Sequence, residues 1–160
     1  MRKLVPLFLM VLLLTSCNFS KGVKADLMTG LTYSYNGFAV DKAIVVNNGN
    51  TVNGKKHPQN SQLTVVLQGV RNYTEVDGKV YPGCSLEVID EAGNIVLKND
   101  DLFKGVEATK EDASTLSASV TLGSPMAAGN SYKMKAKVYD KKNTENVIDI
   151  ELSFDVTDAN

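Results

Sequence analysis

Two segments near the C-terminal end of the chain alternate between apolar and polar residues with a period of two. Lysines take alternate positions in 131–140 ("SYKMKAKVYD"), and acidic residues and serine do so in 147–156 ("VIDIELSFDV"). This is the period of a β-strand, whose successive side chains point to opposite faces. A shift by one residue would turn the lysines toward the core. The two segments therefore predict a β-hairpin with one apolar and one charged face.

The charges also predict the register of this hairpin. A turn over 140–146 pairs Tyr139 with Val147, Lys137 with Asp149 and Lys135 with Glu151. Opposite charges on facing residues contribute on the order of 0.2 to 1 kcal/mol per pair. The charged face thus has a structural explanation and needs no ligand.

From Leu31 onward the rest of the chain shows the same short-period pattern. Its alternating runs are separated by segments rich in turn-forming residues, such as "NNGN", "DEAGN" and "SPMAAGN". Seven or eight short strands in a domain of about 130 residues predict an all-β fold with two packed antiparallel sheets.

The last hairpin also has a counterpart in known domains. A Gly-Asn turn precedes Tyr132, and an alternating strand, a polar turn and a final amphipathic strand follow it. This order resembles the last hairpin of immunoglobulin-like domains in bacterial envelope proteins, in which a tyrosine corner often lies where Tyr132 lies. The resemblance implies an immunoglobulin-like antiparallel β-sandwich over 31–160. Antibody-type hallmarks are missing, since the chain has no tryptophan and this range contains a single cysteine.

The N-terminal segment is of a different kind. Arg2 and Lys3 precede an apolar run, residues 4–14, that is shorter than the roughly 20 residues needed to span a bilayer. A basic start followed by a short apolar run predicts a secretory signal peptide. Two alternatives stay open at this point: an ordinary signal peptide cut near Ser16, and a short transmembrane anchor.

The four residues at the end of this segment, "LTSC" at 14–17, resemble the lipobox of bacterial envelope lipoproteins of the Bacteroidetes type. The resemblance implies that a signal peptide, 1–16, is removed, that Cys17 is acylated, and that 17–30 is a short flexible tether. Stable attachment takes more than one acyl chain. Asn18 lacks the acidic character associated with inner-membrane retention, and the acidic residues typical of surface export are also missing. The expected location is the outer membrane, on its periplasmic face.

Charge and cysteine content narrow the classes of function. The chain has 17 basic and 18 acidic residues; loss of Arg2 and Lys3 leaves 15 and 18, a net charge of −3. This net charge lacks the excess of basic residues that is typical of nucleic-acid-binding proteins. Cys84 in "YPGCSLEV" has no partner once Cys17 is acylated, so we expect a small buried core residue.

The sequence offers one candidate ligand loop, the polar segment 47–60. It contains His57, the only histidine of the chain, next to Lys55 and Lys56. Long loops of this kind are either functional or mobile, and a solvated His57 is expected. One histidine cannot build a His-rich metal site, and 90–94 ("DEAGN") is expected to be a hairpin turn. We therefore expect no metal, no cofactor and no catalytic residues.

The function predicted from these features is that of a membrane-anchored, non-catalytic lipoprotein that binds or scaffolds another component of the cell envelope. A second hypothesis is a carbohydrate-binding accessory protein of a glycan-uptake system, with Tyr73, Tyr81 and Tyr139 as the candidate sugar platform. A third is a fimbrial or adhesin subunit that pairs by strand exchange.

Overall fold

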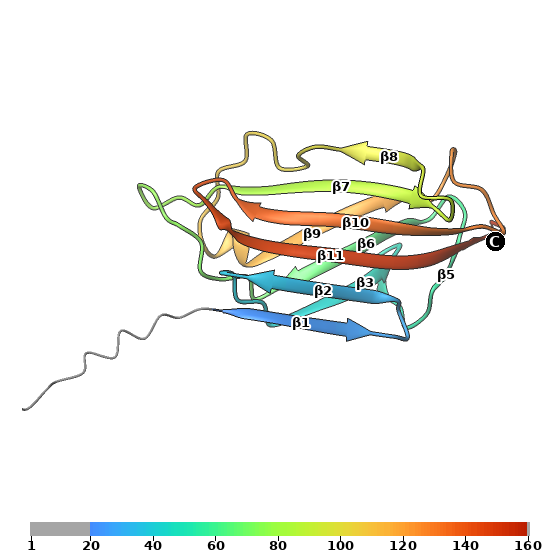
Figure 1. Cartoon of the computed structure of the whole chain (residues 1–160), viewed down its shortest axis with the longest axis horizontal. Coiled ribbons are helices and arrows are strands. Elements are labelled where there is room, and N and C mark those ends of the chain that lie inside the picture. The colour runs from blue at the N-terminus through green and yellow to red at the C-terminus, as the bar shows by residue number, and fades with distance from the viewer. Residues whose placement is uncertain (1–19, 160) are drawn as a thin grey trace, which may run out of the picture.

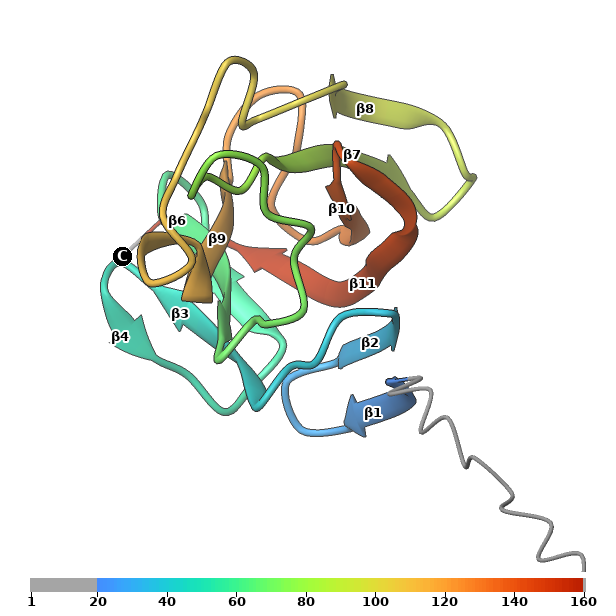
Figure 2. The same cartoon turned by 90° about the vertical axis from the view of Figure 1, so that its left-hand side faces the viewer.

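A computed structural model describes residues 20–159 as two β-sheets packed face to face (Figure 1). The seven-stranded sheet has the order β1-β2-β11-β10-β7-β8, with β5 paired to β11, and the four-stranded sheet has the order β4-β3-β6-β9. Figure 2 shows the two layers from one end. The strands are β1 (Lys21–Asp26), β2 (Leu31–Asn36), β3 (Lys42–Asn47), β4 (Asn50–Thr51), β5 (Lys56–Pro58), β6 (Gln62–Gln68), β7 (Pro82–Asp90), β8 (Ile95–Asn99), β9 (Thr115–Thr121), β10 (Ser131–Asp140) and β11 (Asn143–Thr157).

The core lies between the sheets and is built from every second residue of the central strands. In β6 the residues Leu63, Val65 and Leu67 are buried, and in β11 Ile150 and Leu152 are buried. The partners of these strands contribute their own alternate residues to the same cluster. The apolar residues of the alternating strands are thus buried between the two sheets, which confirms the predicted all-β sandwich.

The strand order is that of an immunoglobulin-like sandwich. One sheet carries β3, β6 and β9 side by side, as immunoglobulin-like domains carry strands A, B and E, and the other carries β7, β10 and β11, as they carry C, F and G. Eleven strands are present in 20–159 rather than the expected seven or eight. The strands that were not expected are β1 and the short strands β4 and β5, whereas β2 is the predicted run that begins at Leu31.

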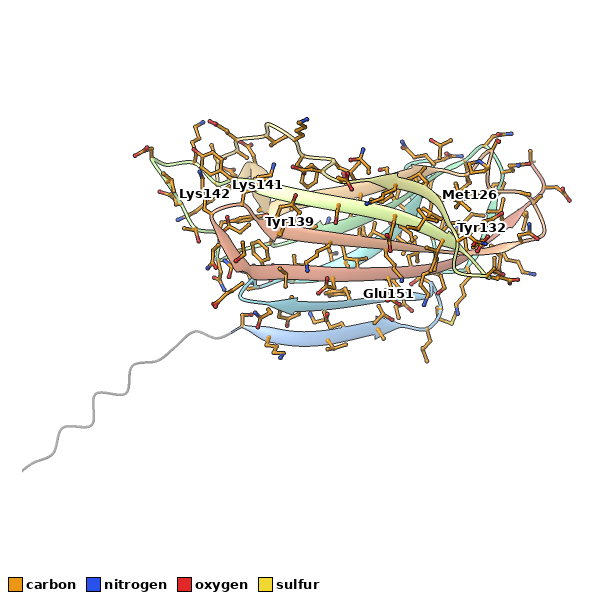
Figure 3. The ribbon with its side chains drawn as sticks, turned by 45° about the horizontal axis from the view of Figure 1, so that its top comes forward. Met126, Tyr132, Tyr139, Lys141, Lys142 and Glu151 are labelled. Atoms are coloured by element: carbon orange, nitrogen blue, oxygen red, sulfur yellow. The ribbon has the colours of Figure 1, made fainter. Side chains whose placement is uncertain are left out.

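Tyr132 forms the expected tyrosine corner at the start of β10. Its ring is buried and stacks on Phe154, with 6.0 Å between the ring centroids. Its hydroxyl accepts a hydrogen bond of 2.8 Å from the backbone N–H of Ala127, in the loop that leads into the strand. Figure 3 shows the neighbouring loop residue, Met126, beside Tyr132 at this end of the sandwich. The corner therefore fixes the loop to the core.

The predicted hairpin register is confirmed. Tyr139 lies opposite Val147, Lys137 opposite Asp149 and Lys135 opposite Glu151. The turn is shorter than expected, because Asp140 already pairs with Asn143 across a register shift. The ion pairs extend to a third strand: Lys137 pairs with Asp149 at 3.9 Å, Lys133 with Glu151 at 3.2 Å and Lys135 with Glu87 of β7 at 4.0 Å. We call these six residues the charged ladder.

The predicted tether over 17–30 is wrong for most of its length. Residues 21–26 form β1, which pairs with β2 along all six of its residues. The sandwich therefore begins at Lys21 and not at Leu31. β1 contains a single large apolar residue, Val23, and its pairing with β2 rather than core burial holds it in place. The signal peptide and Cys17 lie outside the described residues. No helix within 20–159 is long and apolar enough to cross a membrane.

Candidate functional site

The candidate ligand loop does not expose its histidine. His57 lies in β5, opposite Val156 of β11, and is 2% exposed. The expectation of a solvated histidine is wrong, because parallel pairing of β5 with the end of β11 draws this part of the loop onto the sandwich. Burial lowers the pKa of His57 below its ordinary value, and the nearby charge of Asp155 opposes that shift in part. Its Nε2 has no hydrogen-bond partner within the described residues.

The two lysines before His57 are exposed and do not join it in a shared site. The carbonyl of Lys55 accepts a hydrogen bond of 2.8 Å from the N–H of Asp155. The side chain of Lys55 lies against Gly30. A methyl group added at Gly30 would be 3.0 Å from Cε of Lys55. Lys56 begins β5 opposite Asp155. This end of the loop is thus part of the sandwich, while the side chains of Lys55 and Lys56 face solvent.

Cys84 is a buried core residue, as expected. It is fully enclosed within β7, and its backbone N–H donates to Asp101 at 3.1 Å. Burial, followed by the charge of Asp101, raises the pKa of the thiol to about 12. A thiol of such a high pKa is a poor nucleophile. Among residues 20–159 no group of three or more histidine, cysteine or acidic side chains is placed to hold a metal ion.

The three candidate tyrosines do not form a flat exposed platform. Tyr73 is buried, packs edge-on against Phe38 with centroids 4.8 Å apart, and donates its hydroxyl proton to the carbonyl of Ala113 at 3.1 Å. Tyr81 is half-buried, with the Lys142 ammonium 4.3 Å from its ring centroid. Tyr139 is half-buried with its ring over Gly83, near the turn that carries Lys142 (Figure 3). This arrangement removes the feature on which the glycan-binding hypothesis depended.

A different region has the properties of a contact surface: the hairpin of β1 and β2, residues 21–36, which we call the edge hairpin. Six large apolar side chains are well exposed in 20–159, and three of them lie here: Val23 at 72%, Leu27 at 86% and Met28 at 69%. Single exposed apolar residues are ordinary, whereas a cluster on one element indicates an interaction surface. Figure 1 shows the edge hairpin along one margin of the larger sheet.

The turn that carries Leu27 and Met28, residues 27–30, is firmly built. Asp26 accepts hydrogen bonds from the N–H of Met28 and the hydroxyl of Thr29, both at 2.9 Å, and its carbonyl accepts the N–H of Gly30. The bond from Thr29, then that from Met28, lowers the pKa of Asp26, so the carboxylate stays charged. Gly30 has a φ of +76°, which favours glycine. The two apolar side chains are therefore displayed by an ordered turn.

The edge hairpin is also fastened to the rest of the sandwich. β2 pairs with β11 over six residues. The Lys24 ammonium donates to the carbonyl of Asp41 at 3.0 Å and lies 5.9 Å from the ring centroid of Tyr33. At the other end of the hairpin, Asn36 donates to the carbonyl of Glu145 at 2.8 Å. Rigid attachment lowers the entropy that a partner would have to remove on binding.

The outer edge of β1 has no neighbouring strand within the described part of the chain. The N–H of Gly37 donates to the carbonyl of Ser20, so Ser20 and every second residue after it direct their backbone groups toward β2. The groups of Lys21, Val23 and Ala25 then point outward. Such an edge is a template for pairing with another strand.

The sequence does carry signals for the edge hairpin. "KADLMTG" places Leu27 and Met28 between a turn-forming aspartate and Gly30. Aspartate and glycine at these positions are typical of a tight turn, and two apolar residues within a turn have no core to enter. The signal was weak because β1 lacks the apolar half of the strand period, so the segment resembles a tether.

Comparisons with known proteins add little to the geometry. No protein-family description matches this sequence, and no curated protein matches it. Among solved structures the chain is similar to that of chicken MD-1 complexed with lipid IVa, at 13% sequence identity and a TM-score of 0.26, over 85% of this chain and 98% of that chain. A likeness at this level carries no inference about this chain, and the fold assignment rests on the strand order described above.

Proposed function

We propose that this chain is a membrane-anchored, non-catalytic binding or scaffolding module of the bacterial cell envelope, held by lipid on Cys17. The edge hairpin is its contact element for another envelope protein. The observation that carries the proposal is an ordered turn that presents Leu27 and Met28, at 86% and 69% exposure, away from the core.

The expected anchor and the contact element are close in the chain. Three residues lie between Cys17 and the start of β1 at Lys21, so these four steps of the chain reach at most about 14 Å. β1 then extends about 20 Å to the turn at 27–30, since a strand rises about 3.3 Å per residue. Leu27 and Met28 thus lie at the end of β1 far from the anchor of the same copy, up to about 34 Å from Cys17 along the chain, where a partner in the periplasm can reach them.

The chemistry of the turn fits a protein partner with an apolar pocket. Leucine and methionine offer large, flexible apolar side chains, and methionine adapts to irregular pockets. Full burial of such a side chain contributes about 1.5 to 3 kcal/mol. For the strand-exchange hypothesis the observations divide: the pairing of β11 with both β10 and β2 counts against it, and the unpaired outer edge of β1 within the described residues counts for it.

Acylation is tested by expressing the full chain in a Gram-negative host with an alkyne-labelled fatty acid. We expect label and membrane fractionation for the natural chain, and neither for Cys17→Ser. Cys84→Ser is the matched control. The thiol of Cys84 is buried and is not the expected acylation site, so this variant should keep the label. An unlabelled natural chain, confirmed by intact mass, would overturn the anchor.

The contact element is tested by placing a photo-crosslinking amino acid at Leu27 in the same cells. Ile95 is the matched control position, since it is 55% exposed in the edge strand on the opposite margin of the sheet. We expect discrete crosslinked products from position 27 and none above background from position 95. Equal yields from the two positions would contradict a role for the edge hairpin.

A further inference from the structure

We propose that two copies of this chain pair antiparallel through the outer edges of their β1 strands. The two seven-stranded sheets then become one continuous sheet, with Val23 on the two-fold axis. This pairing uses the strand edge and not the turn at 27–30, so it stands independently of the proposed contact with an envelope partner.

The backbone pattern of β1 limits which residues can face each other. The outward groups belong to Lys21, Val23 and Ala25, so only these can form the hydrogen-bonded pairs between copies. Centring on Val23 pairs Val23 with its counterpart and Lys21 with Ala25. All three residues then satisfy their outward N–H and C=O groups.

The side chains favour this register over its neighbours. With Val23 at the centre, each Lys24 faces Gly22 of the other copy and each Lys21 faces Ala25. Centring on Lys24 would place two lysines directly opposite each other, which is destabilising. Centring on Gly22 would shorten the overlap to residues 20–24. The chosen register is thus the longest one without facing like charges.

The same features argue for a strand rather than a lipid surface as the occupant. A free strand edge presents alternating donors and acceptors, and acyl chains can satisfy neither. A second copy supplies both at matching spacing. The register spans residues 20–26 and leaves Leu27 and Met28 beyond the partner strand, where they stay accessible.

The pairing is tested by disulfide trapping in a chain of residues 18–160, which contains every strand of the structure and lacks Cys17. In the proposed dimer the two Val23 Cα atoms lie about 5.5 Å apart, within the range that a disulfide spans. Val23→Cys should therefore give a covalent dimer under mild oxidation. Lys21→Cys is the matched control. The two Lys21 Cα atoms of the dimer lie more than about 10 Å apart, so this variant should form no covalent dimer.

A second variant tests the backbone bonds. Ala25→Pro removes an outward N–H and leaves the bonds between β1 and β2 intact, whereas Ala25→Ser keeps the N–H. Combined with Val23→Cys, the proline should slow dimer formation at least about tenfold, a change of about 1.4 kcal/mol, and the serine should not. Circular dichroism checks that both variants fold. Equal trapping at positions 21 and 23, trapping unaffected by the proline, or no trapping at any concentration would each overturn the pairing.

Discussion

The immunoglobulin-like frame, which consists of β3 and β6 to β11, and the edge hairpin use the same backbone pairing in opposite ways. In the frame, the apolar residues of β10 and β11 are buried and their outward lysines and acids pair with one another. In the edge hairpin, β1 pairs on one side only, and Val23, Leu27 and Met28 face water. The charged ladder needs no partner, because its lysines and carboxylates pair with one another. The edge hairpin is ordered, yet within residues 20–159 the outward backbone groups of β1 and the exposed apolar side chains have no contact, which indicates a partner.

The largest expected contrast between the two regions is in stability. Phe154 is buried and stacks on Tyr132, so Phe154→Ala should lower the free energy of unfolding by about 3 to 5 kcal/mol. Leu27→Ala should change it by less than about 0.5 kcal/mol, because the side chain is exposed. Urea denaturation of both variants measures the difference. A comparable loss for Leu27→Ala would mean that the turn belongs to the core.

The tyrosine corner gives a smaller effect within the frame. Tyr132→Phe keeps the ring and removes the hydroxyl that accepts the N–H of Ala127. We expect a loss of about 1 kcal/mol, the net contribution of a typical hydrogen bond, and faster amide exchange at Ala127. Unchanged exchange at Ala127 would show that the loop is held by other contacts.

The buried His57 should make the free energy of unfolding depend on pH. Burial lowers its pKa from the model-peptide value of 6.5, so below pH 6.5 the unfolded chain binds a proton that the folded chain does not. Stability should therefore fall as the pH drops below 6.5, by at most about 1.4 kcal/mol per pH unit, and be constant above that range. Denaturation between pH 7.5 and 5.5 measures the slope. His57→Leu should flatten it; an equal slope in this variant would assign it to other groups.

The smallest effect is expected in the charged ladder. Lys137 and Asp149 are half exposed and 3.9 Å apart, so Lys137→Ala should lower the free energy of unfolding by about 0.2 to 1 kcal/mol, less at high salt. Denaturation with and without added salt measures it. A larger, salt-independent loss would mean that the lysine stem and not its charge stabilises the sheet.

The sequence allowed the frame to be predicted because its strands carry both halves of the two-residue pattern. The register of β10 and β11 followed from where lysines and acids alternate, and the corner at Tyr132 was implied by the resemblance to the last hairpin of immunoglobulin-like domains. These features are local, and each is repeated over several residues, so errors in one position do not change the outcome.

The remainder depended on contacts between distant segments. β1 has only Val23 as a large apolar residue, and it is ordered because β2 is already paired to β11. His57 is buried because β5 adds in parallel to the far end of β11. Neither arrangement leaves a periodic pattern in the segment itself. The third strand of the charged ladder likewise required knowing that β7 lies beside β10.

Amide hydrogen exchange compares the two regions most directly. The rates are measured residue by residue for the full chain in membranes and for residues 18–160 at low concentration. If the outer edge of β1 pairs with a second copy on the membrane, the outward amides of Val23 and Ala25 should exchange more slowly in the membrane-attached chain, while those of β10 and β11 stay the same. Equal rates at Val23 and Ala25 in the two samples, or protection gained in β10 and β11 instead, would contradict pairing through this edge.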